Sequence, residues 1–223
     1  MPDACAEALR LLGHELRRPL TVIRGAATLL VDEADRLPSS SREQMLTLID
    51  TSAAAMSDLI DDLLVAVHLE SGDLRFTIEP VALSGLVAEV VEAAGLVAPD
   101  RAIEVAGHDD LVVEVDREQA LRALRAVVFN AIQFSPAGTP VEVAVSVEPD
   151  IVSLLVLDRG PGIPAPQRER AFEKFTRLDQ QVGGAGLGLF LARGLVRGMG
   201  GDVTVGERED GGAAVCFTLK RRG

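Results

Sequence analysis

Apolar residues, with one serine among them, recur at alternating spacings of four and three within the first 70 residues. The first stretch contains Leu16, Leu20, Ile23, Ala27 and Leu30, and the second contains Met45, Ile49, Ser52, Met56, Leu59 and Leu63. This spacing is typical of the seam between packed helices. Residues 37–41, Leu-Pro-Ser-Ser-Ser, place a helix breaker and a serine cap between the stretches. The pattern therefore predicts a helical hairpin over residues 3–70.

A single hairpin with heptads on both arms leaves an apolar face open to water. Pairing with a second copy of the same hairpin buries that face in a four-helix bundle. We therefore expect a homodimer. Residues 37–41 do not decide the handedness of the hairpin turn.

From Leu74 onward the pattern changes to short β-type runs that alternate with helices. Ser71-Gly72-Asp73 is expected to end the second helix, which divides the chain into domains at residues 1–72 and 73–223. Helices gathered against a largely antiparallel sheet make the fold class α+β, with an α/β sandwich as the second domain. Strands are predicted near residues 74–79, 102–106, 111–115, 140–147, 150–158, 201–207 and 213–220, and helices near 83–95, 117–134 and 186–198.

Composition narrows the functional classes. The 223 residues are 48% hydrophobic, enough for a substantial core, and carry a net charge of −12, which argues against a nucleic acid partner. Cys5 and Cys216 lie at opposite ends without metal-ligand spacing, so we expect neither a disulfide framework nor a zinc site. No apolar run is long enough to span a bilayer. The expected location is cytoplasmic, and a membrane sensor upstream is compatible with the sequence.

The segment His14-Glu15-Leu16-Arg17-Arg18-Pro19 holds the first candidate chemistry. If Leu16 and Leu20 occupy the seam, His14 faces water, where a substrate side chain must lie. A neutral imidazole is a competent nucleophile near pH 7, and Glu15 is placed to orient the ring or take its proton. Pro19 is expected to bend the helix one turn later. A lone His-Glu pair on a helix is more often an exposed pair without a role, so the interpretation depends on the rest of the chain.

Three segments of the second domain offer groups that suit a metal ion or an anion, although an asparagine inside an apolar helix is usually structural and a lone glycine triplet is weak evidence. Asn130 lies on a predicted helix and offers an amide oxygen of the kind that Mg²⁺ accepts. Asp158-Arg159-Gly160-Pro161-Gly162 follows an apolar strand, which favours a ligand crevice or a simple turn about equally. The loop Gly184-Ala185-Gly186-Leu187-Gly188-Leu189 opens a helix, where backbone N–H groups favour anions. Because residues 178–185 have no periodicity and end in glycines, they predict a mobile lid.

Taken in order, these segments resemble the catalytic core of the sensor histidine kinases of two-component signalling, over nearly the whole chain. Residues 14–19 are similar to the phospho-acceptor box of that family and Asn130 to its N box. Residues 158–162 resemble its first glycine box, Phe172-Glu173-Lys174-Phe175 its phenylalanine box, and residues 184–189 its second glycine box. The second domain resembles the ATP-binding fold shared with DNA gyrase and heat-shock chaperones.

The resemblance implies that ATP phosphorylates His14, with Glu15 assisting proton removal, and that an aspartate of a response regulator then receives the phosphoryl group. It implies that Asn130 binds Mg²⁺ and that Asp158 accepts a hydrogen bond from the adenine amino group. The remaining implied nucleotide-binding residues are Gly160, Gly162, Phe172, Phe175, Arg177, Gly184, Gly186, Leu187 and Gly188. For the two phenylalanines, a purely structural role in the core remains an alternative.

The sequence departs from the family pattern at four positions. Arg18 stands where the family commonly has threonine or asparagine, which implies weak phosphatase activity toward the regulator. Ala126 and Gln133 replace a polar and a basic residue around Asn130, and Ala213 replaces a threonine that often helps to bind adenine. These three departures keep a second hypothesis open, a degenerate kinase that acts as a nucleotide-binding dimeric scaffold. A third hypothesis is an ATPase of the gyrase or chaperone kind.

Overall fold

The computed structural model describes residues 2–33, 36–107, 111–179 and 183–222. The chain divides into two compact units. The first runs to Val67 and includes Gly183–Ala185, and the second holds the remaining described residues.

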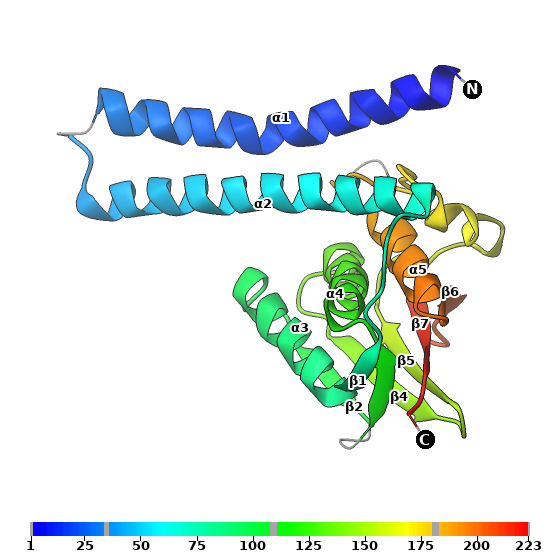
Figure 1. Ribbon diagram of the computed structural model, residues 1–223. Helices are drawn as coiled ribbons and strands as arrows, with labels where there is room; N and C mark the ends of the chain where they lie inside the picture. The colour runs from blue at the N-terminus through cyan, green and yellow to red at the C-terminus, as the bar shows by residue number, and fades with distance from the viewer. Residues whose placement is uncertain (1, 34–35, 108–110, 180–182, 223) are drawn as a thin grey trace. The chain divides into compact units, whose positions relative to one another are not determined.

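The first unit is the predicted helical hairpin, formed by α1 (Pro2–Asp32) and α2 (Ser39–Ser71), which lie side by side in Figure 1. The residues predicted for the seam are half-buried, except Leu20, which is exposed. Two helices alone cover only one stripe of each other's surface, so some apolar positions stay open to water. The axis of α1 curves (Figure 1), and Pro19 lies inside the helix.

Helix α2 ends as predicted, at Ser71. Gly72 follows with a φ of +73°, and the N–H of Asp73 donates to the carbonyl of His68 over 3.1 Å. This arrangement satisfies a carbonyl of the last helical turn, and glycine adopts the left-handed conformation without a steric penalty.

The second unit contains a five-stranded sheet with the order β2-β4-β5-β7-β6. Only β2 and β4 run parallel, and the other neighbours are antiparallel. A separate antiparallel pair joins β1 to β3. The strands are β1 (Glu79–Ala82), β2 (Ile103–Ala106), β3 (Val112–Val115), β4 (Val141–Val147), β5 (Ile151–Leu157), β6 (Asp202–Glu207) and β7 (Ala213–Lys220).

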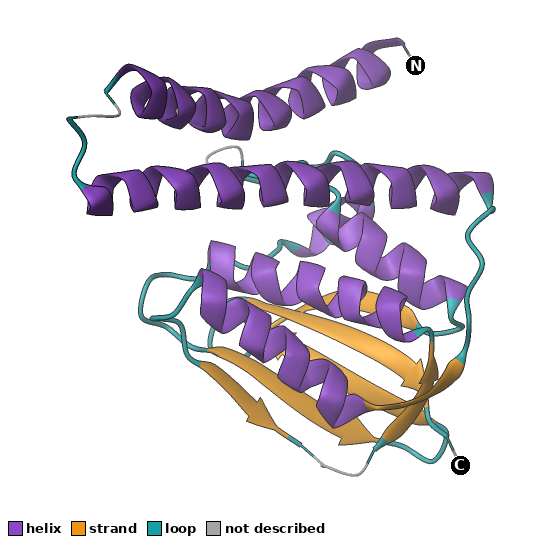
Figure 2. Cartoon of the chain, turned by 60° about the vertical axis from the view of Figure 1, so that its left-hand side comes forward, coloured by secondary structure: helices purple, strands orange, loops and turns teal. Residues whose placement is uncertain are grey.

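Three helices cover one face of this sheet, as Figure 2 shows: α3 (Leu83–Val97), α4 (Arg117–Phe134) and α5 (Gly188–Gly198). Two short 3₁₀ helices, η1 (Ala165–Gln167) and η2 (Arg170–Phe172), precede α5. Alternate residues of the central strands are buried, as expected where one face of a sheet is packed against helices. The predicted α+β architecture is confirmed, although α5 begins two residues later than expected.

The prediction of the first strand is wrong: a strand was expected over residues 74–79, and β1 occupies Glu79–Ala82. Its partner β3 ends at Val115 because Asp116 caps α4, with Oδ1 accepting the N–H of Gln119 over 3.1 Å. The second oxygen of Asp116 accepts the N–H of Thr77 over 2.8 Å. Phe76 lies against Gly198 of α5 instead. Residues 74–78 therefore have no strand with which to pair.

Among the helices of the described ranges, none is both long and apolar enough to cross a membrane.

Candidate active site

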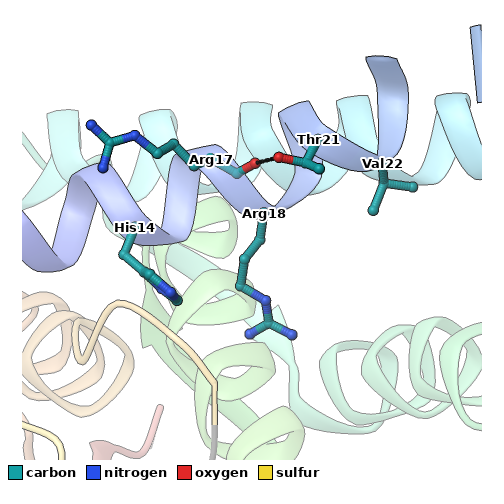
Figure 3. A pocket seen from close by; sticks show the side chains of 5 residues that line it. All are labelled: His14, Arg17, Arg18, Thr21 and Val22. Carbon is teal, nitrogen blue, oxygen red and sulfur yellow. Dashed lines mark hydrogen bonds between the residues drawn. The ribbon is translucent and has the colours of Figure 1, made fainter. Parts of the chain in front are cut away.

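His14 lies on α1 with 69% of its side chain exposed, as the heptad pattern predicted. Its Nδ1 is 3.5 Å from Oε1 of Glu15, whose side chain is largely buried. An open hollow of about 380 Å³ beside the histidine is lined by His14, Arg17, Arg18, Thr21 and Val22. Figure 3 shows His14 and Arg18 extending to the same side of the helix and Arg17 to another. Residues four apart share a helix face, so Arg18 lies on the same face of α1 as the imidazole.

Asp158 follows β5 directly and is 7% exposed. Its Oδ1 accepts the backbone N–H of Gly160 over 2.8 Å and that of Ala213 over 3.0 Å. The backbone N–H of Asp158 in turn donates to the carbonyl of Ala213 over 3.0 Å. Within the described residues, both hydrogen bonds to the carboxylate reach Oδ1. The carboxylate is thus fixed by one oxygen, which leaves Oδ2 as an acceptor for a ligand.

Two predicted glycines around Asp158 are required by close contacts. A Cβ on Gly160 would lie 2.8 Å from the carbonyl oxygen of Phe134, too close for any other residue without movement. Gly162 has a φ of +71° and faces the backbone of Gly212. The first glycine box therefore brings the end of α4 and the start of β7 against the carboxylate.

Sequence reasoning missed two residues of this region. Gly212 has a φ of +109°, and a Cβ there would collide with the carbonyl oxygen of Asp158. The buried hydroxyl oxygen of Ser135 accepts the N–H of Arg159 over 3.2 Å. Two features of the sequence could have indicated these residues: the Gly211-Gly212 pair before the last strand, and the Ser-Pro step after α4.

Asn130 and the second glycine box lie next to each other. Asn130 is half-buried on α4, and a Cβ on Gly188, the first residue of α5, would lie 3.2 Å from its Nδ2 and 3.6 Å from its Oδ1. Leu187 is buried immediately before the helix. The start of α5, where a helix favours anions, therefore lies next to the amide of Asn130.

The phenylalanine box contacts the glycine loop through the backbone. Phe172 is buried, whereas Phe175 is half-buried and has a φ of +63°. The N–H of Phe175 donates to the carbonyl of Gly186 over 2.8 Å. A Cβ on Gly186 would lie 2.6 Å from the carbonyl oxygen of Thr176, so glycine is required there.

The other residues predicted around the phosphates are Arg177, which is half-buried, and Gly184, which is exposed with a φ of +125°. The proposed lid over residues 178–185 includes residues 180–182, which lie outside the described ranges. Its mobility stays a prediction.

The donor set limits what kind of metal fits. Across the residues that the structure describes, no three His, Cys, Asp or Glu side chains gather where they could hold a metal ion. A single amide oxygen, that of Asn130, suits Mg²⁺, which keeps several waters and binds mainly through substrate phosphates. It does not suit a metal that needs a complete protein cage.

An exposed histidine on a helical hairpin, followed by a sandwich domain with a buried carboxylate and a glycine loop at a helix start, defines the class of phosphotransferases to which histidine kinases belong. Two family models match the chain. The His Kinase A (phospho-acceptor) domain matches residues 6–72, and the histidine kinase-, DNA gyrase B- and HSP90-like ATPase matches residues 115–223.

Several sensor histidine kinases are similar to the chain in sequence. The sensor histidine kinase WalK of Bacillus subtilis is 30% identical over 217 residues, which cover 93% of this chain and 35% of that protein. The probable sensor histidine kinase TcrY of Mycobacterium tuberculosis is 32% identical over 198 residues, which cover 86% of this chain and 41% of that protein. The chain therefore spans well under half the length of these relatives.

Solved structures of histidine kinases are similar to this chain in fold. The mycobacterial sensor histidine kinase MprB is 30% identical with a TM-score of 0.61, and the match covers 66% of this chain and 99% of that one. Full-length ShkA in complex with AMPPNP is 29% identical with a TM-score of 0.68, and the match covers 96% of this chain and 46% of that one. The chain belongs to the sensor histidine kinases, and its second domain is of their ATP-binding type.

Proposed function

We propose that this chain is an ATP-dependent protein-histidine kinase that autophosphorylates His14 and passes the phosphoryl group to an aspartate of a response regulator. The observation that carries the proposal is the combination of an exposed His14–Glu15 pair with a carboxylate, Asp158, fixed for ligand binding in the second domain. The family supports the same reaction.

The nucleotide is recognised at both of its ends. Oδ2 of Asp158 accepts a hydrogen bond from the adenine amino group, and Gly160 and Gly162 let the surrounding backbone pack closely around that carboxylate. Gly184, Gly186 and Gly188 let backbone N–H groups approach the phosphates, and the start of α5 favours their negative charge. Phe172 and Phe175 hold the neighbouring backbone, and Arg177 lies on the same segment as a phosphate contact.

Asn130 would hold Mg²⁺ through its amide oxygen, and the ion, when bound, neutralises charge on the phosphates during transfer. Asn130 lies beside Gly188, which supports this assignment because the metal must touch both the protein and the phosphates.

The chemistry at His14 follows from its contact with Glu15. The carboxylate lies nearest to Nδ1, which favours the tautomer with the proton on Nδ1 and the lone pair on Nε2. Nε2 attacks the γ-phosphorus, the bond from that phosphorus to the β–γ bridging oxygen breaks, ADP leaves, and Glu15 takes up the Nδ1 proton. The phosphoryl group then moves from Nε2 to a carboxylate oxygen of the regulator.

Such a transfer requires the two domains, which we place at residues 1–72 and 73–223, to move relative to each other. The glycine that ends α2 makes Ser71–Asp73 the proposed hinge. We further propose a homodimer through the hairpin and, because ATP is the donor, a cytoplasmic location for this segment. A membrane-anchored sensor elsewhere in the protein is compatible with the lengths of the relatives.

A degenerate kinase that binds nucleotide without transfer is the second candidate. Ala213 favours it, because this residue contacts Asp158 through its backbone alone and offers no hydroxyl beside the carboxylate. Ala126 and Gln133 add two further departures around Asn130. This candidate predicts nucleotide binding with no phosphoryl transfer.

The test is incubation with γ-labelled Mg-ATP beside a His14→Gln control. Acid-labile label on the protein that the control lacks supports the kinase and eliminates the scaffold. Nucleotide binding without label supports the scaffold. Sustained phosphate release that His14→Gln leaves unchanged would instead support an ATPase.

A further inference from the structure

Arg193 joins three elements of the second unit through one side chain. It lies on α5, five residues after Gly188, and only 12% of its side chain is exposed. Its Nη1 donates to Oε2 of Glu169 over 2.8 Å, and its Nε donates to Oδ1 of Asp202 over 3.1 Å. Glu169 immediately precedes η2, and Asp202 begins β6.

Cζ of the same guanidinium lies over the ring of Phe172, 4.3 Å from the ring centroid. This geometry is attractive because the ring face is electron-rich. Only arginine combines a flat face for stacking with edge N–H groups that reach two carboxylates, and lysine offers a single point charge. Burial alone would lower the pKa of Arg193, but the hydrogen bonds to Glu169 and Asp202 raise it above its ordinary value.

These contacts form a closed path within one domain. Arg193 holds Phe172, the backbone of Phe175 bonds to Gly186, and Gly188 lies beside Asn130. Gly188 and Arg193 both belong to α5, so the same helix carries the glycine beside Asn130 and the arginine that contacts Phe172. The phenylalanine box is thereby attached to α5 through the side chain of Arg193, and to Gly186, two residues before α5, through the backbone.

We propose that Arg193 is a positioning residue that holds the phenylalanine box against the start of α5, so that the Gly186–Gly188 backbone is set to bind the nucleotide phosphates. The inference rests on the proposed function. Arg193 touches no reacting atom in this scheme and acts through Phe172. Its loss should therefore weaken nucleotide binding more than it slows transfer from bound nucleotide.

Arg197 provides a matched control. It lies one turn later on α5 and donates to the same Asp202, with Nε to Oδ1 at 2.8 Å and Nη2 to Oδ2 at 3.2 Å. Its side chain is 54% exposed, and within the described ranges its hydrogen bonds go to Asp202 and not to Glu169. Arg197→Met therefore removes a cation and an ion pair from the same helix without touching the phenylalanine box.

The test compares Arg193→Met, Arg193→Lys and Arg197→Met with the wild type by two readouts. The first is autophosphorylation, where we expect Arg193→Met to raise KM for ATP about tenfold with kcat nearly unchanged, and Arg193→Lys to recover part of the loss. The second is amide hydrogen exchange without nucleotide, where residues 170–177 and 186–190 should exchange about tenfold faster in Arg193→Met. Arg197→Met should match the wild type in both.

Unchanged exchange in both Arg193 variants overturns the proposal, as does an equal effect of Arg197→Met. If Arg193→Met does not fold, Arg193→Lys and Phe172→Leu give the decisive comparison, because each removes the stacking while retaining a side chain of similar character. Exchange is measured without nucleotide, so a wild type that fails to phosphorylate His14 refutes the proposed kinase activity and still leaves Arg193 tested.

Discussion

Asp158 is held by its Oδ1, which accepts two backbone N–H groups, from Gly160 and Ala213. Asparagine keeps an oxygen for those two donors but turns an amide N–H₂ toward the adenine amino group. We expect Asp158→Asn to weaken ATP binding about 10- to 100-fold, the loss of a hydrogen bond to a charged group worth about 1.5–3 kcal/mol. Calorimetric titration with ATP measures the change.

Asp158→Ala is the companion variant. It leaves two buried donors without partners, so the free energy of unfolding should fall by about 1–3 kcal/mol for each, while Asp158→Asn should unfold close to the wild type. Wild-type ATP affinity in Asp158→Asn would contradict the assigned role of the carboxylate.

Arg18 sits one helical turn after His14 on the same face, where a small hydroxyl or amide would position a water molecule. A long cation cannot do so. We expect Arg18→Thr to raise the rate of dephosphorylation of the phosphorylated regulator by about 100-fold, the lower end of general acid–base effects. The measurement is loss of label from the regulator with and without nucleotide.

Arg17→Thr is the control for that variant, since its side chain leaves the helix in another direction (Figure 3). Rapid dephosphorylation by the wild type, or equal rates in both variants, would refute the role given to Arg18.

At the scale of elements, an arginine from outside α4 donates hydrogen bonds to the carbonyls at the C-terminal end of that helix and in the turn that follows. Arg101 donates to the carbonyls of Ile132, Ser135, Pro136 and Thr139 at 2.6 to 3.2 Å, and also to the Thr139 hydroxyl. The carbonyl of Ile132 is one that the last turn of a helix leaves unpaired, and the other three belong to the turn that follows. The same turn carries Ser135, which bonds to the backbone beside Asp158.

We expect Arg101→Met to lower the free energy of unfolding by about 3 kcal/mol, because several carbonyls lose a charged donor together. Exposed Arg75 gives the control variant Arg75→Met, which should change stability by less than about 0.5 kcal/mol. Urea denaturation of both variants checks the prediction, and equal midpoints would contradict it.

The junction of α5 and β6 should depend on pH through Asp202. Hydrogen bonds from Arg197, and then those from Val203 and Arg193, lower the pKa of Asp202 from 3.8 to about 2 against the opposing effect of burial. A lowered pKa in the folded state means that the carboxylate stabilises the fold above about pH 4 and loses this contribution as the pH falls toward 2.

We therefore expect the stability difference between wild type and Asp202→Asn to be largest at neutral pH and to shrink as the pH falls below about 4. Urea midpoints of both proteins at several pH values give this difference. If the stability difference stays constant or grows on acidification, the ion pairs of Asp202 do not stabilise the folded state.

The element boundaries show where sequence patterns are sufficient. Strands β4, β5 and β7 were predicted within a residue because alternation between a packed face and an open face is a local property. β1 was misplaced because Leu74, Phe76 and Ile78 alternate with polar residues, as in a strand. The strand that pairs with β1 ends at Val115, so pairing begins only at Glu79. A strand needs a neighbour, and its neighbour lies more than 30 residues away.

At the scale of the whole molecule, the hairpin carries apolar side chains that one copy of the chain leaves exposed, among them Leu46, Leu48, Ile60, Leu64 and Val67. Leu64 of α2 and Val105 of β2 are each 52% exposed, which makes them a matched pair. In the expected four-helix bundle, a charge at Leu64 is buried against the second copy, whereas a charge at Val105 stays in water.

We expect Leu64→Glu to weaken dimerisation at least about tenfold and Val105→Glu to leave it unchanged. Sedimentation equilibrium over a range of protein concentrations gives both dissociation constants. Equal dissociation constants would place the dimer contact away from this face of the hairpin, and a monomeric wild type would refute the homodimer.

The sequence alone determined the helical hairpin, the α+β sandwich and the order of the motifs, because periodicity and glycine-rich boxes are local properties of the chain. Only the tertiary structure decided which backbone groups meet. It placed Gly212 against Asp158, Ser135 against Arg159, and Arg193 over Phe172, and it began β1 opposite the residue at which β3 ends. Such contacts join residues that are tens of positions apart, and close packing, which no local pattern encodes, selects them.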